Sequence, residues 1–262
     1  MNYPKLYWQI LKYNVNRELQ FRSDFWLSIF SRLVWFLMLV FFFNVLYRQI
    51  LTINGWTLYE SLLLLSIFQI IETTLYTFFI SNFSQMPQYI SEGDLDFLLL
   101  KPIDTQFFVS LRYFSLTSAI NLIAPIILFG VALSHLHVSL SLGQVLLFLG
   151  GFLSSIVILY SLWFITVISL FWLTKIFEIY ELFLSLFRFM QYPSSVYQGA
   201  VRHFFSFVFP IILTVTVPAQ VLLGRFSELH NLVWLPVIAV ITFVVARILW
   251  NSGLKVYSSA SS

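Results

Sequence analysis

The sequence reads Glu92, Gly93, Asp94, Leu95, Asp96, Phe97, Leu98, Leu99, Leu100, Lys101 and Pro102 between two long apolar runs. Gly93 is suited to ending the incoming helix, Asp94 to capping a new one, and Pro102 to limiting its length. Three leucines, Leu95, Leu98 and Leu99, share one face at i, i+3 and i+4 spacing. The segment therefore predicts a helix of about two turns at a water boundary.

The composition requires a bilayer around most of the chain. Of its 262 residues, 60% are hydrophobic and 10% are charged, whereas about 25% of the residues in an average soluble domain are charged. No polar stretch is long enough to form a soluble domain of its own. Cysteine is absent, which excludes disulfides and thiolate chemistry. The sequence thus predicts an all-α membrane protein, with a single transmembrane domain over residues 1–262.

A helix needs about 17 to 25 apolar residues to cross the hydrocarbon core. The chain offers seven candidate runs: Phe25–Tyr47, Leu58–Phe83, Phe107–Leu133, Val145–Leu173, Ile176–Tyr192, His203–Leu223 and Leu232–Trp250. Pro210 and Pro218 break the sixth run, and broken helices at membrane depth are tolerated where they are buried in protein. We therefore predict six crossings and an outer re-entrant helical hairpin. The re-entrant region covers residues 193–228 and begins with Pro193.

The basic residues predict the orientation. Residues 1–22 place them among leucines and tyrosines at helical spacing, which favours an interfacial amphipathic helix over a disordered tail. Seven basic residues flank the predicted inner side and three the outer side: Lys5, Lys12, Arg17, Arg22, Lys101, Lys175 and Lys255 against Arg48, Arg202 and Arg225. The positive-inside rule then places both termini and a coupling loop over residues 84–106 in the cytoplasm.

Charged residues within the predicted spans are Arg32, Glu72, Glu181 and Arg188. Insertion scales assign about 2.5 to 3.5 kcal/mol to such a residue at the bilayer centre. Arg32 and Glu72 differ in depth by about 6 Å at 1.5 Å per residue. Either an ion pair between the first two spans or direct substrate contact explains them. Glu181 and Arg188, together with Glu178, form a second candidate cluster.

Other residues carry smaller expectations. Arg112 and Arg247 lie near inner helix ends, where long side chains extend to the surface. The pairs Gly150/Ser154 and Gly151/Ser155 favour close helix packing in the fourth span. His135 and His137 have no third ligand nearby, so we predict no metal site.

The inner loop resembles a known family. The segment from Tyr89 to Pro102 looks like the membrane subunits of bacterial ABC transporters of the ABC-2 type, in the six-span branch whose loop reads Gly-x-Leu-Asp-x-Leu-Leu-x-Lys/Arg-Pro. Tyr192-Pro193, Phe209-Pro210 and Val217-Pro218-Ala219 resemble the outer re-entrant region of that branch. The resemblance implies a permease subunit of an exporter. Two such subunits, identical or similar, would pair with two cytoplasmic ATPases, whose closure on ATP reaches the spans through an inner-loop coupling helix.

The residues agree with a permease that lacks its own motor. The sequence contains no Gly-x-x-x-x-Gly-Lys-Ser/Thr phosphate loop, so we expect no cofactor on this chain, and ATP and magnesium on the partner ATPase. The implied substrate is amphiphilic or hydrophobic, such as a drug, a peptide or a lipid. It would leave the cytoplasm or the inner leaflet of a bacterial inner membrane. Membrane lipids are the other expected partners, and nucleic acid is not one.

Three alternatives remain open on the sequence. The segment Glu92–Pro102 is also compatible with a plain interfacial loop. An ion-coupled secondary transporter would show inverted repeats and midplane ion ligands, neither of which is evident. A membrane-embedded lipid-modifying enzyme would need convergent polar groups around a nucleophile and a base.

Overall fold

The computed structural model describes residues 3–20, 22–173, 181, 184–225 and 229–257. The α-helices are α1 (Tyr3–Glu18), α2 (Arg22–Gln49), α3 (Leu58–Leu75), α4 (Ser81–Phe83), α5 (Met86–Ser91), α6 (Leu95–Leu99), α7 (Thr105–Leu111), α8 (Leu116–Asn121), α9 (Ile123–Leu136), α10 (Leu142–Ile168), α12 (Gly199–His203), α13 (Leu213–Leu222) and α14 (Leu229–Val256). Two π-helical turns (Tyr76–Ile80, Phe204–Val208) and three 3₁₀ turns (Ser169–Phe171, Arg188–Gln191, Ser194–Val196) extend or connect them.

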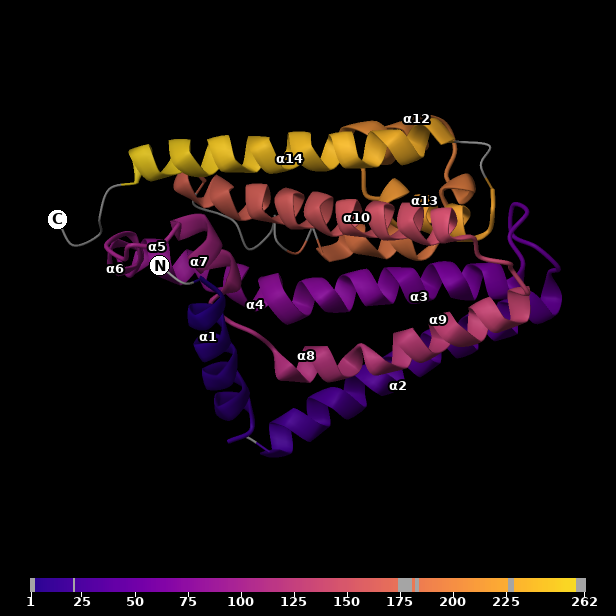
Figure 1. The fold of residues 1–262 in the computed structure, drawn as a ribbon, viewed down its shortest axis with the longest axis horizontal. Helices are drawn as coiled ribbons and strands as arrows, with labels where there is room; N and C mark the ends of the chain where they lie inside the picture. Colours follow the sequence, from indigo (N-terminus) through magenta and orange to yellow (C-terminus); the bar gives the residue numbers. More distant parts are fainter. Residues whose placement is uncertain (1–2, 21, 174–180, 182–183, 226–228, 258–262) are drawn as a thin grey trace.

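Among the described residues, five helical stretches are long and apolar enough to cross a membrane: Ser23–Gln49, Leu58–Ser91, Leu116–Leu136, Leu142–Phe171 and Leu232–Val256. They lie along the long axis of the molecule (Figure 1). This confirms an all-α membrane protein. The third stretch was predicted to begin at Phe107, but it begins at Leu116. Helix α7 ends at Leu111, and Ser115 caps a new helix by accepting a hydrogen bond from the Ser118 amide at 3.2 Å.

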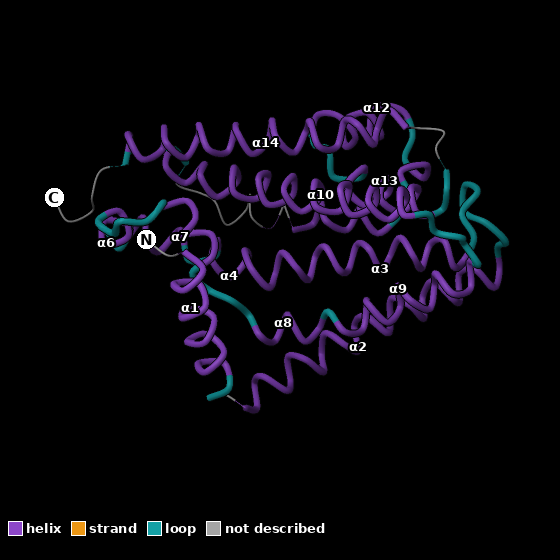
Figure 2. The backbone as a smooth tube through the Cα atoms, viewed as in Figure 1, coloured by secondary structure: helices purple, strands orange, loops and turns teal. Residues whose placement is uncertain are grey.

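The two ends of the bundle differ in what they hold. Figure 1 places both termini and α5, α6 and α7 at one end, which we call the α6 end. The connections between α2 and α3 and between α9 and α10 lie at the opposite end, together with α12, and we call this the α12 end. Figure 2 shows most of the loops gathered at these two ends.

The described residues on either side of the predicted fifth run, Ile176–Tyr192, lie at opposite ends of the bundle. Helix α10 brings the chain to the α6 end (Figure 1), whereas the Ser195 carbonyl accepts a hydrogen bond at 2.9 Å from Asn54 Nδ2 at the α12 end. Residues 174–180 and 182–183, Glu178 among them, lie outside the described residues. The sixth crossing stays a prediction.

The proline-broken run folds as two short helical pieces. Helix α12 and its π-helical turn lead inward to buried Pro210, and α13 leads back out to the α12 end. At the inner turn, Ser155 Oγ of α10 donates to the Thr214 carbonyl at 2.6 Å. Ser194, next to buried Pro193, donates its amide to Thr216 Oγ1 at 3.1 Å. At ten residues, α13 is too short to span a bilayer. The outer re-entrant hairpin stays a prediction.

Close packing between α10, α13 and α14 follows from a small residue. A Cβ at Gly151 would lie 3.5 Å from Pro218 Cγ and 4.0 Å from Leu235 Cδ1, whereas one at Gly150 would meet nothing within 4 Å. One of the two predicted small-residue pairs therefore faces helices of the same chain. Small residues let helices approach closely in this way.

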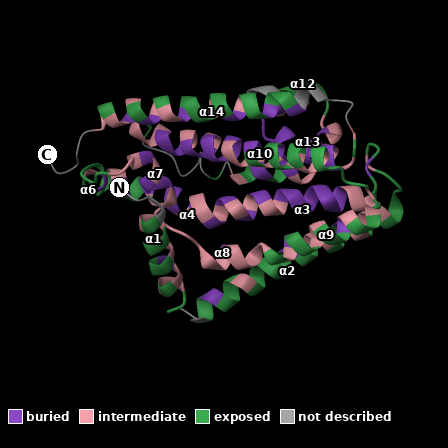
Figure 3. Cartoon of the chain, viewed as in Figure 1, coloured by how far each residue is buried: buried purple, intermediate pink, exposed green. Residues whose placement is uncertain are grey.

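The core lies around α3, and the outer helices face away from it. In the most apolar part of the stretch Leu58–Ser91, which begins with α3, 67% of the residues are buried. In the corresponding part of Ser23–Gln49, on α2, 11% are buried. Exposed residues gather on α2, α9 and the outward side of α14 (Figure 3). Apolar side chains exposed along whole helices are expected where lipid is the solvent.

Helix α1 lies across the direction of the spans at the α6 end (Figure 1). Its last turn is tied to α8, because the Glu18 carboxylate accepts hydrogen bonds from the Thr117 amide and hydroxyl, both at 2.9 Å. Asn14 Nδ2 donates to the Arg112 carbonyl at 2.9 Å. Lys5, Lys12 and Trp8 remain exposed, as expected of a helix at a membrane surface.

Candidate functional site

The segment Glu92–Pro102 forms a short helix at the α6 end. Buried Gly93 has φ +80°, a conformation that glycine adopts without steric cost. Helix α6 has five residues rather than the two turns that were predicted. Asp94 does not cap it: its backbone is already helical (φ −64°, ψ −18°), and its side chain accepts no capping hydrogen bond. The cap in this loop is Asp104, whose carboxylate accepts a hydrogen bond from the Phe107 amide at 2.9 Å at the start of α7.

Helix α6 has one face on its own chain and one face free. Leu95 and Leu98 are buried at 0% and 3% exposure, so they anchor the helix. Phe97 is 68% exposed and Leu100 is 81% exposed, although both are large and apolar. Leu99 is exposed as well, and does not belong to the buried face with which its spacing grouped it. Glu92, Asp94, Lys101 and Pro102 are exposed around this helix, and Asp96 is half-buried.

Two contacts connect the α6 segment to the bundle. The Lys101 ammonium lies 4.6 Å from the centre of the Phe108 ring on α7, within the range of a cation–π interaction. Tyr257, one residue past α14, lies close to the carboxylates of α6. Its own burial first, and then the negative charges of Asp96 and Asp94, raise the pKa of the Tyr257 hydroxyl.

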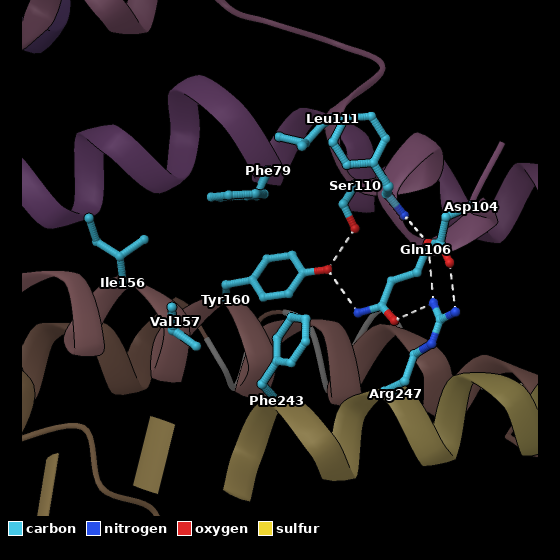
Figure 4. Close-up of a pocket in the computed structure, with 11 residues that line it drawn as sticks. Phe79, Asp104, Gln106, Ser110, Leu111, Ile156, Val157, Tyr160, Phe243 and Arg247 are labelled. Carbon is cyan, nitrogen blue, oxygen red and sulfur yellow. Dashed lines mark hydrogen bonds and ion pairs between the residues drawn. The ribbon is translucent and has the colours of Figure 1, made fainter. Parts of the chain in front are cut away.

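A chain of polar side chains continues from this loop into the bundle (Figure 4). Arg247 of α14 forms two parallel bonds with Asp104, Nη2 to Oδ2 at 2.6 Å and Nη1 to Oδ1 at 3.1 Å. Arg247 Nη1 also donates to Gln106 Oε1 at 3.0 Å, and Gln106 Nε2 donates to the Tyr160 hydroxyl at 3.2 Å. Ser110 completes the chain through a bond of 2.8 Å to the same hydroxyl.

This series of hydrogen bonds holds together α7, α10 and α14. Burial alone would raise the pKa of Asp104, but the hydrogen bonds from Arg247 and from the Phe107 amide outweigh it, and the pKa lies below the ordinary carboxyl value. Asp104 is therefore an anion at neutral pH. Bidentate arginine–carboxylate pairs are among the strongest and most directional polar contacts in proteins.

A cavity of about 500 Å³ opens beside the polar chain. Apart from the polar residues above, its walls are apolar and come from Phe79, Phe107, Leu111, Ile156, Val157 and Phe243. Figure 4 shows the Tyr160 hydroxyl, Gln106 and Arg247 on one side of it and Ile156 and Val157 on the other. An apolar space with a few polar groups at one edge is typical of a site for an amphiphilic molecule.

The sequence missed this arrangement. Arg247 was expected to extend to the surface, and instead it is paired with a residue 143 positions away. Arg112 was given the same expectation, but its Nη1 donates to the Tyr89 hydroxyl at 3.2 Å, and its guanidinium lies 5.3 Å from the Tyr113 ring centre. The available signal was Asp104, a good helix cap three residues before the apolar Phe107.

Arg32 and Glu72 line a second cavity, of about 360 Å³, between α2, α3 and the α8–α9 pair. The Arg32 guanidinium lies over the Tyr76 ring at 4.5 Å and interacts through its charge with the Glu72 carboxylate. The predicted second cluster is not assembled in the described residues, since Glu181 and Arg188 are both exposed.

The α12 end has an ion pair of its own. Arg225 Nη2 lies 2.6 Å from Glu60 Oε1 and donates to the Gly55 carbonyl at 3.1 Å. The guanidinium lies 5.2 Å from the centre of the buried Trp56 ring. Nearby, His135 stacks on Tyr59 with ring centres 4.2 Å apart. The first contact joins the loop after α13 to the start of α3 and the loop before it, and the second joins α9 to α3.

Together, the bundle and the α6 segment define a multi-pass membrane protein that presents a short helix with exposed apolar side chains at one end. The chain belongs to the ABC-2 family of transporter proteins: the family model described as "ABC-2 family transporter protein" matches residues 33–261. Comparison with curated proteins and with solved structures gave no match. Membership in the family supports a permease subunit of an ABC transporter that works with an ABC ATPase.

Proposed function

We propose that this chain is the permease subunit of an ATP-driven exporter, in which α6 docks into a groove on the partner ATPase. The observation that carries the proposal is the exposure of Phe97 and Leu100 on a helix whose other face is anchored by Leu95 and Leu98. A helix that is fixed to its own chain and apolar on its free side is suited to seating in a partner's groove.

The contacts at the α6 end supply a route for movement. A displacement of α6 would reach α7 through Lys101 and Phe108. From α7 it would reach α14 through Asp104 and Arg247. Because α14 lines the 500 Å³ cavity with Phe243 and Arg247, closure of the ATPases would change the shape of that cavity. We propose that ATP and magnesium bind on the partner alone.

The charge distribution supports the orientation. Lys5, Lys12, Arg17, Lys101 and Lys255 belong to the α6 end, which the positive-inside rule assigns to the cytoplasm. Both termini would then be cytoplasmic, and the re-entrant hairpin would face outward. In a bacterial inner membrane, two such permeases, identical or similar, would serve two ATPase subunits and move an amphiphilic or hydrophobic substrate outward.

The test is the assembly and ATPase rate of the complex reconstituted with its ATPase. The double variant Phe97→Ser/Leu100→Ser should insert in the membrane normally, because neither side chain packs in the core. It should lose copurification with the ATPase and lower the ATPase rate of the mixture to that of the ATPase alone.

The matched control is Leu51→Ser, since Leu51 is 93% exposed at the opposite end. This variant should keep wild-type assembly and rate. Wild-type assembly in the double variant, or equal losses in the control, would contradict docking through α6.

A further inference from the structure

The cavity between α2, α3 and the α8–α9 pair brings charged and amide groups together within the membrane-spanning stretches. Its lining includes a guanidinium, a carboxylate and two amides, from Arg32, Glu72, Gln69 and Asn121. Charged groups within membrane spans are costly and therefore mark functional positions. The apolar part of its wall comes from Leu33, Trp35, Phe36, Ala124 and Pro125.

One donor in this cavity is unused. Asn121 Nδ2 is shielded from solvent and has no hydrogen-bond partner among the described residues. A buried polar group without a hydrogen-bond partner is unfavourable, so the site is incomplete as it stands. An acceptor oxygen placed in the cavity would satisfy this donor.

The cavity is open on its α2 side. Trp35 is 64% exposed and Leu33 38% exposed, and Arg32 is exposed as well. Helix α2 carries one of the most exposed apolar surfaces in the molecule, since 11% of the residues in its most apolar part are buried. A molecule could therefore place its head in the cavity while its apolar tail stays in the lipid beside α2.

The charges of the cavity restrict the head group. Arg32 and Glu72 cancel, so a neutral or zwitterionic head enters without a net charge penalty, whereas an anionic or cationic head leaves one protein charge uncompensated. A phosphate would meet the Arg32 guanidinium and Asn121 Nδ2, and an ammonium would meet the Glu72 carboxylate. Both pairings are charge-assisted hydrogen bonds.

We propose that the cavity lined by Arg32, Glu72 and Asn121 binds the zwitterionic head of a phosphate- and ammonium-bearing amphiphile, with the tail against α2. The inference rests on the proposed permease function, and it names the class of substrate. The cavity lies about 15 Å along α2 from its first residue, at 1.5 Å per residue. A head group bound there would lie within the stretch of α2 that is apolar enough to cross a membrane.

The experiment measures lipid binding to the purified chain in a sugar-headed detergent by native mass spectrometry. The probes are phosphatidylethanolamine, phosphatidylglycerol and a long-chain alkyltrimethylammonium, with glycerophosphoethanolamine as a tail-less competitor. Phosphatidylethanolamine should bind about 10-fold more tightly than either charged probe. The tail-less competitor should not displace it.

Variants separate the groups. Arg32→Gln and Asn121→Leu should weaken phosphatidylethanolamine binding about 10-fold, and Glu72→Gln should remove the preference over phosphatidylglycerol. Arg48→Gln, an exposed arginine at the far end of α2, is the matched control and should bind as wild type. If a single variant folds poorly, Arg32→Gln/Glu72→Gln leaves no unpaired charge and should still lose binding.

Equal binding of all three probes, a preference for a charged probe, or wild-type binding in Arg32→Gln/Glu72→Gln would overturn the proposal. The measurement needs neither ATP nor a partner. Loss of headgroup preference with normal ATPase coupling would therefore refute this inference alone. Headgroup binding without ATPase assembly would instead refute the permease mechanism.

Discussion

The two ends of the molecule each have an arginine–carboxylate pair at 2.6 Å, yet the pairs do different things. At the α12 end, Arg225 joins Glu60 to the loop at Gly55 and Trp56, so the contact closes a surface. At the α6 end, Arg247 joins Asp104 to a chain that runs through Gln106 to Tyr160. The comparison teaches that one pair clamps the loop after α13 to the start of α3, whereas the other belongs to a series of hydrogen bonds that connects α7, α10 and α14.

The largest loss of stability is expected from forcing apart α10, α13 and α14, which pack closely between the two ends. Gly151→Leu places a side chain where Pro218 and Leu235 already lie, and overpacking of this kind costs about 1 to 3 kcal/mol or more. We expect loss of monodisperse protein in size-exclusion chromatography. Gly150→Leu, which meets open space, should behave as wild type, and equal damage in both variants would mean that the close approach at Gly151 is unimportant.

The next effect should distinguish the pairs by stability. The Glu60 side chain is 12% exposed, so Arg225→Gln leaves a largely buried charge without its partner and should cost about 1 to 3 kcal/mol. Arg247→Gln should cost less, because its partner Asp104 is 38% exposed and better solvated. Thermal unfolding in detergent measures both. The reverse order would contradict the assignment of the clamp to the α12 end.

A third prediction uses two glycines with the same positive φ angle. Gly93 has φ +80° and Gly55 has φ +81°, at opposite ends of the bundle. A β-branched residue is disfavoured in this region, so Gly93→Val and Gly55→Val should each cost about 1 to 3 kcal/mol of local strain. ATPase stimulation in the reconstituted complex should fall only in Gly93→Val. A similar fall in Gly55→Val would remove the special role of the α6 segment.

The smallest effect is the pH dependence of the inner pair. Because the pKa of Asp104 is lowered in the folded protein, its stabilisation is complete above the ordinary aspartate pKa of about 3.9 and is lost as the pH falls through the lowered value. The stability difference between wild type and Asp104→Asn should therefore be constant from about pH 8 to pH 5, begin to fall near about pH 4 and vanish only below the lowered pKa. A difference that changes near neutral pH would contradict the pairing.

The sequence predicted the elements that depend on local chemistry. Gly93 stops a helix because of its own backbone freedom, and Pro210 separates the two helical pieces of its run, so both features could be recognised without tertiary contacts. Pro218 was expected to break the run as well, but it lies inside α13, which continues to Leu222. The cap was assigned to Asp94 instead of Asp104, because both are aspartates near the start of a short apolar stretch. Only the backbone conformation distinguishes them.

The site could not be predicted in the same way, because it depends on contacts between distant residues. Arg247 is near the end of its helix, and a long side chain there has water within reach. Its actual partner, Asp104, caps the start of α7, which a break between Leu111 and Leu116 separates from the third span. The exposure of Phe97 and Leu100 also follows from how Leu95 and Leu98 anchor α6, and helical spacing alone does not give it.

The central claim is that displacement at the α6 end reaches α14 through Asp104 and Arg247. The natural absence of cysteine allows spin labels at Ser84→Cys and Asn251→Cys, the first beyond α4 and the second on α14. Pulsed electron resonance on the reconstituted complex would measure the distance between them with and without ATP. We predict a shift on ATP binding in the labelled wild type and in Glu60→Gln/Arg225→Gln, and no shift in Asp104→Asn/Arg247→Gln. An equal shift in all three proteins would contradict the claim.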